Sequence, residues 1–287
     1  MRTFLKRNSK IITFLGITFW LTVLTQLPVV WTGSIYAGGG ALILAAMWSP
    51  GIAAMVTQLI FQKNLRHFGW CWGKTRFQFL SYIIPLTIIA LVYGIVWLSG
   101  LGVLSTDGYA LKVSKEFGIE PPLPFVLSVL VIATLGLAVN SIAALGEEIG
   151  WRGFLVPELA KKLTFKSTAI VSGLIWAVWH YPIIIWADYS KDIPAWFALP
   201  IVTVMFVGMS TVMAWIRLKS GSLWGAVIFH ASHNLFIQAV FGQLTIKNEY
   251  TNYFASEFGF LSAIGYGCLA VYIYYVYRNK PVHNKTE

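Results

Sequence analysis

Eight long apolar stretches constrain this chain more than any other feature of its sequence. Each is about 20 residues long, the length that a helix needs to cross the roughly 30 Å hydrocarbon core of a bilayer. Only 11% of the 287 residues are charged, against about 25% in soluble domains. The sequence therefore predicts an all-α, polytopic membrane helix bundle that forms one integral membrane domain over residues 1–287. The expected spans are 10–31, 40–62, 79–103, 125–146, 167–187, 195–216, 222–241 and 258–277.

The basic residues predict how these spans are oriented. When eight spans alternate in direction, 17 of the 21 Lys and Arg residues fall on the side that holds the N-terminus. Because basic residues are enriched in cytoplasmic loops, both termini are expected in the cytoplasm, with the protein in the plasma membrane. The net charge of +10 then faces the lipid bilayer, and nucleic acid is not expected as a partner. The remaining four basic residues, on the opposite side of the membrane, are Lys112, Lys115, Lys191 and Lys247.

Charged side chains interrupt the apolar pattern at residues 146–154, which read GEEIGWRGF. An ionised side chain costs roughly 2.5–3.5 kcal/mol at the centre of a spanning helix, so such residues usually have a function. Glu148 and Arg152 are four residues apart and share one helix face, where they can form a structural or a catalytic pair. Glu147 points about 100° away and stays unneutralised. One long helix, from Phe125 to about Lys162, is expected to carry this motif.

Two further expected spans carry polar residues near the middle of the membrane. The fifth contains His180 in WAVWHYP, and the seventh contains His230, His233 and Asn234 in FHASHNLF. His230 and Asn234 share one helix face. Taken singly, such residues often only bond a neighbouring helix, and we expect this structural role for His233. Together with Glu147 they indicate one shared site, because polar groups at this depth normally face one another or a water-filled cavity.

This combination fits hydrolysis of a peptide bond inside the membrane. Glu147 is the candidate general base, which takes a proton from water and returns it to the leaving amine. His180 is expected to position or polarise that water, and His230 with Asn234 to donate hydrogen bonds to the oxyanion. Arg152 would hold Glu148 ionised and fix the helix that presents Glu147.

The same residues also allow a metal-dependent mechanism. A catalytic zinc ion needs three protein ligands and one open position for water, and Glu147, His180 and His230 can supply those ligands. Glu148 is then the candidate base. The sequence leaves both mechanisms open, with Zn²⁺ as the one cofactor that the residues suggest.

At these positions the chain resembles the CPBP family, which includes CAAX proteases and bacteriocin-processing, Abi-type intramembrane proteases. The family motifs are E-E-x-x-x-R, F-x-x-x-H and H-x-x-x-N, and Trp176 stands where the second motif usually has Phe. The matching residues are Glu147, Glu148 and Arg152, then His180, then His230 and Asn234. The resemblance covers mainly residues 125–240, taken as the protease core, and implies an eight-span protease of the metallo or glutamate type.

The resemblance implies an intramembrane endopeptidase whose site opens to the cytoplasmic side. Its substrate would be a protein or peptide at the membrane, either prenylated or bacteriocin-like, because family relatives cleave prenylated CAAX proteins or take part in bacteriocin maturation and self-immunity. Intramembrane Glu and His residues also form proton relays, so a proton- or ion-coupled transporter is the alternative function. The absence of a visible repeat and of paired broken helices disfavours transport. A non-catalytic membrane scaffold that has kept the fold is a further alternative.

Overall fold

The computed structural model describes residues 2–120, 122–190 and 192–277, and the side chains of these residues from Asn8 onward. The orientation prediction rests in part on Arg2, Lys6, Arg7 and Lys191 and on the basic residues of 278–287. These side chains lie outside the described part of the chain.

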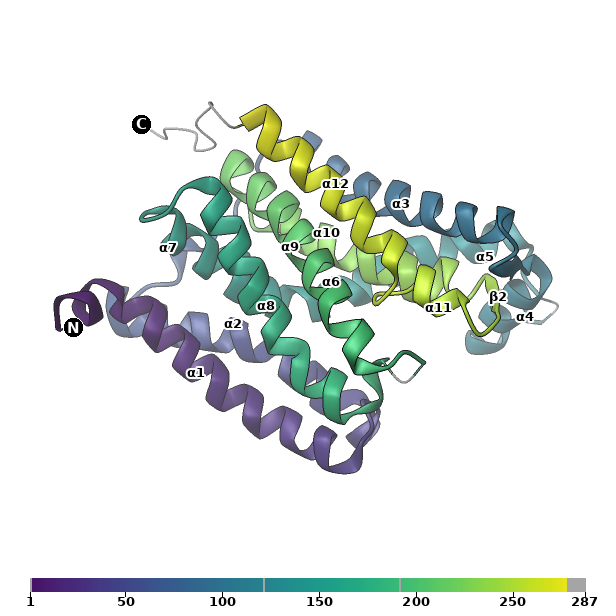
Figure 1. The fold of residues 1–287 in the computed structure, drawn as a ribbon, viewed down its shortest axis with the longest axis horizontal. Helices are drawn as coiled ribbons and strands as arrows, with labels where there is room; N and C mark the ends of the chain where they lie inside the picture. Colours follow the sequence, from purple (N-terminus) through teal and green to yellow (C-terminus); the bar gives the residue numbers. More distant parts are fainter. Residues whose placement is uncertain (1, 121, 191, 278–287) are drawn as a thin grey trace.

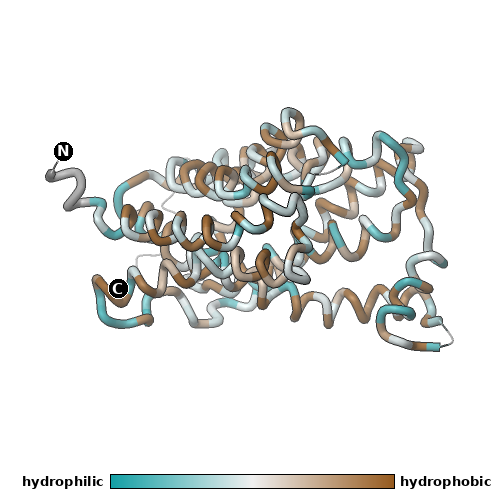
Figure 2. Tube along the Cα trace, turned by 90° about the horizontal axis from the view of Figure 1, so that it is seen from below, coloured by the Kyte–Doolittle hydropathy of each residue, from teal (hydrophilic) through white to brown (hydrophobic). Residues whose placement is uncertain are grey.

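Long helices, packed side by side, form the body of the molecule (Figure 1). Their apolar composition is visible along their length, whereas many hydrophilic residues lie toward the ends of the molecule (Figure 2). The unbroken helices are α1 (Arg2–Thr32), α2 (Ala41–Gln62), α3 (Thr75–Leu98), α8 (Phe165–Trp186), α9 (Ala195–Ser220) and α12 (Phe260–Tyr277). Shorter elements connect them: η1 (Ala37–Gly40), η2 (Arg66–Phe68), α4 (Thr106–Glu116), η5 (Asp188–Ser190) and α11 (Thr251–Phe254).

The motif GEEIGWRGF lies on one long, composite helix, as the sequence predicts. It runs from Phe125 to Ala160 and contains two π-helical stretches, in which the hydrogen-bond register widens. The second stretch begins directly after the two glutamates. The parts are α5 (Phe125–Val131), η3 (Ile132–Gly136), α6 (Leu137–Glu148), η4 (Ile149–Leu155) and α7 (Val156–Ala160).

Seven helices of the described chain are long and apolar enough to cross a membrane, and they match seven of the eight expected spans. This confirms an integral membrane protein built as a helix bundle. The eighth expected span, 222–241, is helical but divides into α10 (Trp224–Asn234) and the π-helix η6 (Leu235–Phe241). This segment is not apolar enough to count as a membrane-spanning helix, because its two histidines, Asn234 and Gln238 lower its mean hydropathy. The orientation of the termini stays a prediction.

One smaller expectation needs correction. The third span ends at Leu98 rather than near residue 103, because Gly100 adopts a left-handed φ of 75° that stops the helix. The fold is all-α, as expected, with one small β-element. A two-stranded antiparallel ribbon joins β1 (Gly102–Leu104) to β2 (Thr245–Lys247), with Val103 opposite Ile246.

The helices alternate in direction, so their connections gather at two ends of the bundle. The start of α1, the end of α12 and the connections 63–74, 161–164 and 221–223 lie at one end, which we call the basic end (Figure 1). The connections 33–40, 99–124, 187–194 and 242–259, with the β-ribbon, lie at the other, which we call the ribbon end.

Helix α10 occupies the centre of the bundle, where it contacts α3, α6 and α9. Helix α6 is held on its other flank by α2, at a crossing built from glycines. A Cβ atom on Gly146 would lie 2.8 Å from the Cα atom of Trp48, and one on Gly150 would lie 2.7 Å from the carbonyl carbon of Pro50. The crossing therefore fixes the position of the two glutamates that lie between these glycines.

Candidate active site

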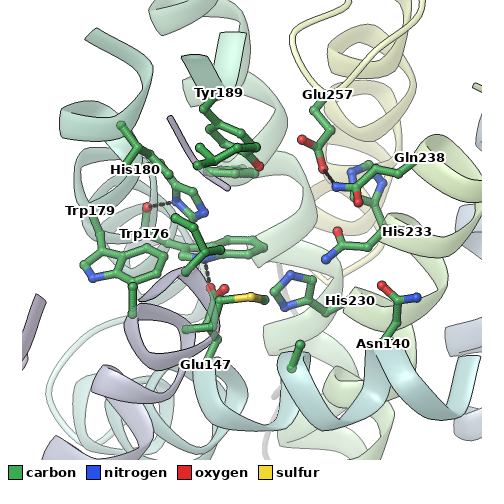
Figure 3. A pocket seen from close by; sticks show the side chains of 18 of the residues that line it. Asn140, Glu147, Trp176, Trp179, His180, Tyr189, His230, His233, Gln238 and Glu257 are labelled. Carbon is green, nitrogen blue, oxygen red and sulfur yellow. Dashed lines mark hydrogen bonds between the residues drawn. The ribbon is translucent and has the colours of Figure 1, made fainter. Parts of the chain in front are cut away.

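Four of the expected site residues come together at one cavity of about 310 Å³. Glu147 reaches it from α6, His180 from α8 and His230 from α10 (Figure 3). Asn234, also on α10, lines the same cavity. The three titratable side chains are at most 7% exposed. The remaining two expected residues, Glu148 and Arg152, are 0% exposed and lie behind the cavity wall.

Glu147 is held by two indole groups. Its Oε2 atom accepts a hydrogen bond of 2.7 Å from Trp176 Nε1 and one of 3.3 Å from Trp151 Nε1. Its Oε1 atom accepts no hydrogen bond from the described residues, and none of their basic side chains lies within ion-pair distance. The carboxylate is therefore oriented at one oxygen and free at the other, where it lines the cavity.

Glu148 is fully engaged with basic partners. Arg152 Nη1 donates to both of its oxygens, at 2.9 and 3.1 Å, which shows the pairing that the spacing predicts. His230 Nδ1 lies 2.9 Å from Glu148 Oε1. Because a carboxylate only accepts, this ring nitrogen carries the proton in the neutral form of His230, and Nε2 is then a lone pair. The Arg152 guanidinium also lies 4.1 Å from the centre of the Trp176 ring.

His180 is fixed by the backbone of its own helix. Its Nδ1 atom lies 2.9 Å from the carbonyl oxygen of Trp176, so Nδ1 is the donor and Nε2 carries the lone pair of the neutral ring. Trp179 packs edge-on against the imidazole at 4.6 Å between ring centres. Phe206 packs against the same ring, also at 4.6 Å.

His233 makes the interhelical contact expected of it, since its Nδ1 atom lies 2.8 Å from the hydroxyl of Tyr266 on α12. It also lines the cavity, and its Nε2 atom is buried without a hydrogen-bond partner among the described residues. Asn234 lines the cavity one turn after His230, where its amide is half-buried.

The cavity has further polar lining that the motifs do not indicate. Asn140, Tyr189, Gln238 and Glu257 point toward it from four different segments (Figure 3). Gln238 donates a hydrogen bond to Glu257. Burial raises the pKa of the Glu257 carboxyl above its ordinary value, although Gln238 and Tyr189 act in the opposite direction. Burial, with Glu257 nearby, raises the pKa of Tyr189 well above its ordinary value.

A second cavity, of about 300 Å³, continues the first toward the ribbon end. Both are lined by Ile35, Tyr36, Tyr189, Gln238 and Glu257. The described residues that line the first cavity include none from the connections at the basic end. The expected cytoplasmic opening therefore conflicts with the expected cytoplasmic termini. The two cannot both hold, because the site opens opposite the end where α1 begins.

The proposed zinc ligands do not form a metal site in this arrangement. Among the described residues, no group of three His, Cys, Asp or Glu side chains is placed to hold a metal ion. Trp176 occupies Glu147 Oε2, and Glu148 is taken by Arg152 and His230. The zinc ligand set stays a prediction, and the proposed mechanism is derived from the protein's own side chains.

Fold and site together define a helical membrane protein with a carboxylate and imidazole cluster in a buried cavity. Comparison with known proteins makes this class more specific. The family model for type II CAAX prenyl endopeptidases, described as Rce1-like, matches residues 126–236, a segment that holds all six expected site residues. This confirms the resemblance to CAAX proteases, because the segment is similar to the Rce1-like type II CAAX prenyl endopeptidases.

A curated relative is similar over part of the chain. CAAX prenyl protease 2 of Methanococcus maripaludis is 31% identical over 99 residues, which cover 33% of this chain and 36% of that protein. The chain thus aligns with about a third of the length of the curated relative that it matches.

Proposed function

We propose that this chain is an intramembrane endopeptidase that hydrolyses a peptide bond of a membrane-associated protein or peptide. The observation that carries the proposal is the convergence of Glu147, His180 and His230, from three helices, on one cavity. The family match to CAAX prenyl endopeptidases over the same residues supports it.

Glu147, rather than Glu148, acts as the general base. Glu148 has a cation or an imidazole at each oxygen, which leaves it no free position for water. Glu147 keeps Oε1 free while Trp176 and Trp151 hold Oε2. A base must reach the proton that it abstracts, and of the two glutamates only Glu147 lines the cavity.

His180 orients the attacking water. Its Nε2 lone pair accepts one hydrogen of the water while Glu147 Oε1 accepts the other, and this arrangement directs a lone pair of the water oxygen at the substrate carbonyl. The bond that forms is between the water oxygen and the carbonyl carbon. When the C–N bond breaks, Glu147 returns the proton to the leaving amine.

His230 and Asn234 stabilise the oxyanion. A protonated His230 balances the charge of the buried set, because Glu147 and Glu148 are then matched by Arg152 and the imidazolium. In that form His230 donates its Nε2–H, and Asn234 adds its side-chain amide from the next turn. Such donors are worth about 10²–10³ in turnover.

We propose a prenylated protein or peptide with a CAAX-type C-terminus as the substrate class. The supporting observation is the similarity to the CAAX prenyl endopeptidase family and to CAAX prenyl protease 2 of Methanococcus maripaludis. A bacteriocin-like peptide is the second candidate substrate, and peptides of both kinds can be compared in one assay.

The test uses the purified full chain in lipid nanodiscs and a synthetic farnesylated CAAX peptide, with products identified by mass spectrometry. His180→Ala and His230→Ala should each lower kcat by about 10²–10⁴. His67→Ala, which changes an exposed histidine at the basic end, should leave kcat unchanged. Equal turnover in all four proteins would contradict the proposed roles, and loss of proton-driven uptake in the same variants would favour the transporter.

Metal dependence is measured separately on the same preparation. Without the zinc mechanism, turnover should survive strong chelation, and metal analysis should find less than one Zn²⁺ per chain. Activity that is lost on chelation and restored by zinc would establish the metal-dependent alternative instead.

A further inference from the structure

An apolar groove of about 420 Å³ runs along the outside of the bundle between α1 and α8. Phe19 and Trp186 on its rim are 61% and 60% exposed, so in a membrane they meet the lipid. The groove is lined almost entirely by apolar side chains, among them Leu15, Val23, Leu27, Ile175 and Val178.

The groove and the catalytic cavity meet at two shared residues, Gln26 and Trp179. Trp179 donates its indole N–H to Thr22 at 2.7 Å and packs against His180 on its other side. A single indole ring thus separates the inner part of the groove from a proposed catalytic histidine.

Gln26 is the exceptional side chain of this region. It is 3% exposed, yet neither its amide nitrogen nor its amide oxygen has a hydrogen-bond partner among the described residues. A buried amide without partners costs about 1–3 kcal/mol, so such a group indicates a ligand that is present during function. A side-chain amide has both donor and acceptor and therefore matches a peptide group.

The nature of the occupant follows from these two features. A lipid acyl chain would satisfy the apolar lining but offers no donor and acceptor to Gln26. A substrate with a long apolar chain next to a peptide group satisfies both, and the shared lining leads its peptide toward His180.

We propose that the groove between α1 and α8 receives the apolar chain of the substrate from the bilayer, and that Gln26 hydrogen-bonds the adjoining peptide group. The inference rests on the proposed function, since it concerns how the substrate of that same site is held. Gln26 is a substrate-binding residue in this account, and it takes no part in proton transfer.

Binding is tested without requiring cleavage. Glu147→Gln protein in nanodiscs is incubated with a CAAX peptide that carries a photoreactive diazirine on its isoprenoid chain, irradiated and digested. Labels should map to groove residues of α1 and α8. Adding excess lipid as a competitor should not prevent labelling by the peptide. Labels confined to other helices, or competed away equally by lipid, would overturn the proposal.

Kinetics test the groove and Gln26 with matched variants. Val178→Trp fills the groove, whereas Leu174→Trp places the same ring on the exposed face of α8 one turn outside it. Val178→Trp should lower kcat/KM for the farnesylated peptide by at least about tenfold and spare the same peptide without the chain. Equal losses for both peptides, or in both variants, would contradict the groove.

Gln26→Leu distinguishes a substrate-binding role of Gln26 from a structural one, because KM and thermal stability are measured together. It should raise KM for both peptides while thermal stability stays equal or rises, because a buried unpaired amide is removed. A fall in stability with KM unchanged would show that Gln26 is structural. If the labels map to the groove but wild-type protein cleaves neither peptide, the groove stands and the proposed protease function fails.

Discussion

At the scale of single residues, Trp176 connects most of the site. Its indole donates to Glu147, its carbonyl oxygen accepts from His180, and its ring lies under the Arg152 guanidinium. The ring also packs edge-on against His230 at 5.3 Å between centres. The family pattern usually has Phe here, which would keep the ring but lose the N–H donor. The exchange therefore affects the hold on Glu147 as well as the shape of the pocket.

Trp176→Phe tests this donor. A hydrogen bond to a charged group is worth about 1.5–3 kcal/mol, so we expect kcat to fall by roughly 10- to 100-fold if the bond is needed in the transition state. KM should change little, because the pocket keeps an aromatic wall. Steady-state kinetics on the farnesylated peptide measure both constants. An unchanged kcat would mean that Trp151 alone suffices to orient the carboxylate.

At the scale of elements, the crossing of α2 and α6 positions both glutamates. Gly150→Ala should destabilise the protein by about 1–3 kcal/mol, because its Cβ would meet the backbone of Pro50 at 2.7 Å. Gly94→Ala on α3 is the matched control, since its Cβ would meet nothing within 4 Å. Thermal unfolding in nanodiscs compares the two. Equal midpoints would show that the helices separate at no cost.

The segment before α12 gives the fold a dependence on pH. Burial raises the pKa of Glu257 above 4.5, so the folded protein holds the neutral carboxyl better than the unfolded chain does. This contribution is present at pH below the unfolded pKa and is lost as pH rises through the folded pKa. Glu257→Gln should thus lose less stability than wild type as pH rises above 4.5. Thermal midpoints across pH measure this, and parallel curves would contradict it.

At the scale of the whole molecule, the position of the opening decides from which side the substrate arrives. The cavity leads to the ribbon end, while the basic loops predict that the other end is cytoplasmic. If that orientation holds, the substrate enters from the outer side or laterally from the bilayer. This differs from the cytoplasmic opening that the family resemblance implies.

Cysteine labelling in spheroplasts tests the orientation. Cys71 is exposed in a basic-end connection, and Tyr250 is exposed near the ribbon end. Both proteins carry Cys268→Ser, so each presents one cysteine: either Tyr250→Cys, with Cys71 replaced by Ser, or native Cys71. In intact spheroplasts a membrane-impermeant maleimide should label Tyr250→Cys. It should label Cys71 only after the membrane is permeabilised. Labelling of Cys71 in intact spheroplasts would reverse the orientation and place the opening in the cytoplasm.

Contacts within one helix could be predicted in detail from the sequence. Between helices the sequence predicted a shared site but not the individual hydrogen bonds. The pairing of Glu148 with Arg152 follows from a spacing of four residues. The bond from Trp176 to Glu147 joins residues 29 apart on two helices, and no local pattern specifies it. The π-helical stretch after Glu148 is equally invisible, because it depends on a change of hydrogen-bond register.

The same limit explains the eighth expected span and the polar lining. The polar residues that mark 222–241 as functional also lower its hydropathy, so length and composition alone do not identify it as a span. Gln26 and Glu257 stand in ordinary sequence contexts and gain meaning only from what lies around them. The position of Gln26 within an expected membrane span, 10–31, is the only sequence signal that points to it.

The central claim is that the free oxygen of Glu147 removes a proton from water. The most direct measurement is the turnover of a farnesylated CAAX peptide by Glu147→Gln protein. The matched control is Glu158→Gln, because Glu158 lies on the same long helix and forms an ion pair with Lys161. We expect Glu147→Gln to lower kcat by at least about 10² with folding intact, and Glu158→Gln to keep the wild-type rate. Wild-type turnover in Glu147→Gln would contradict it.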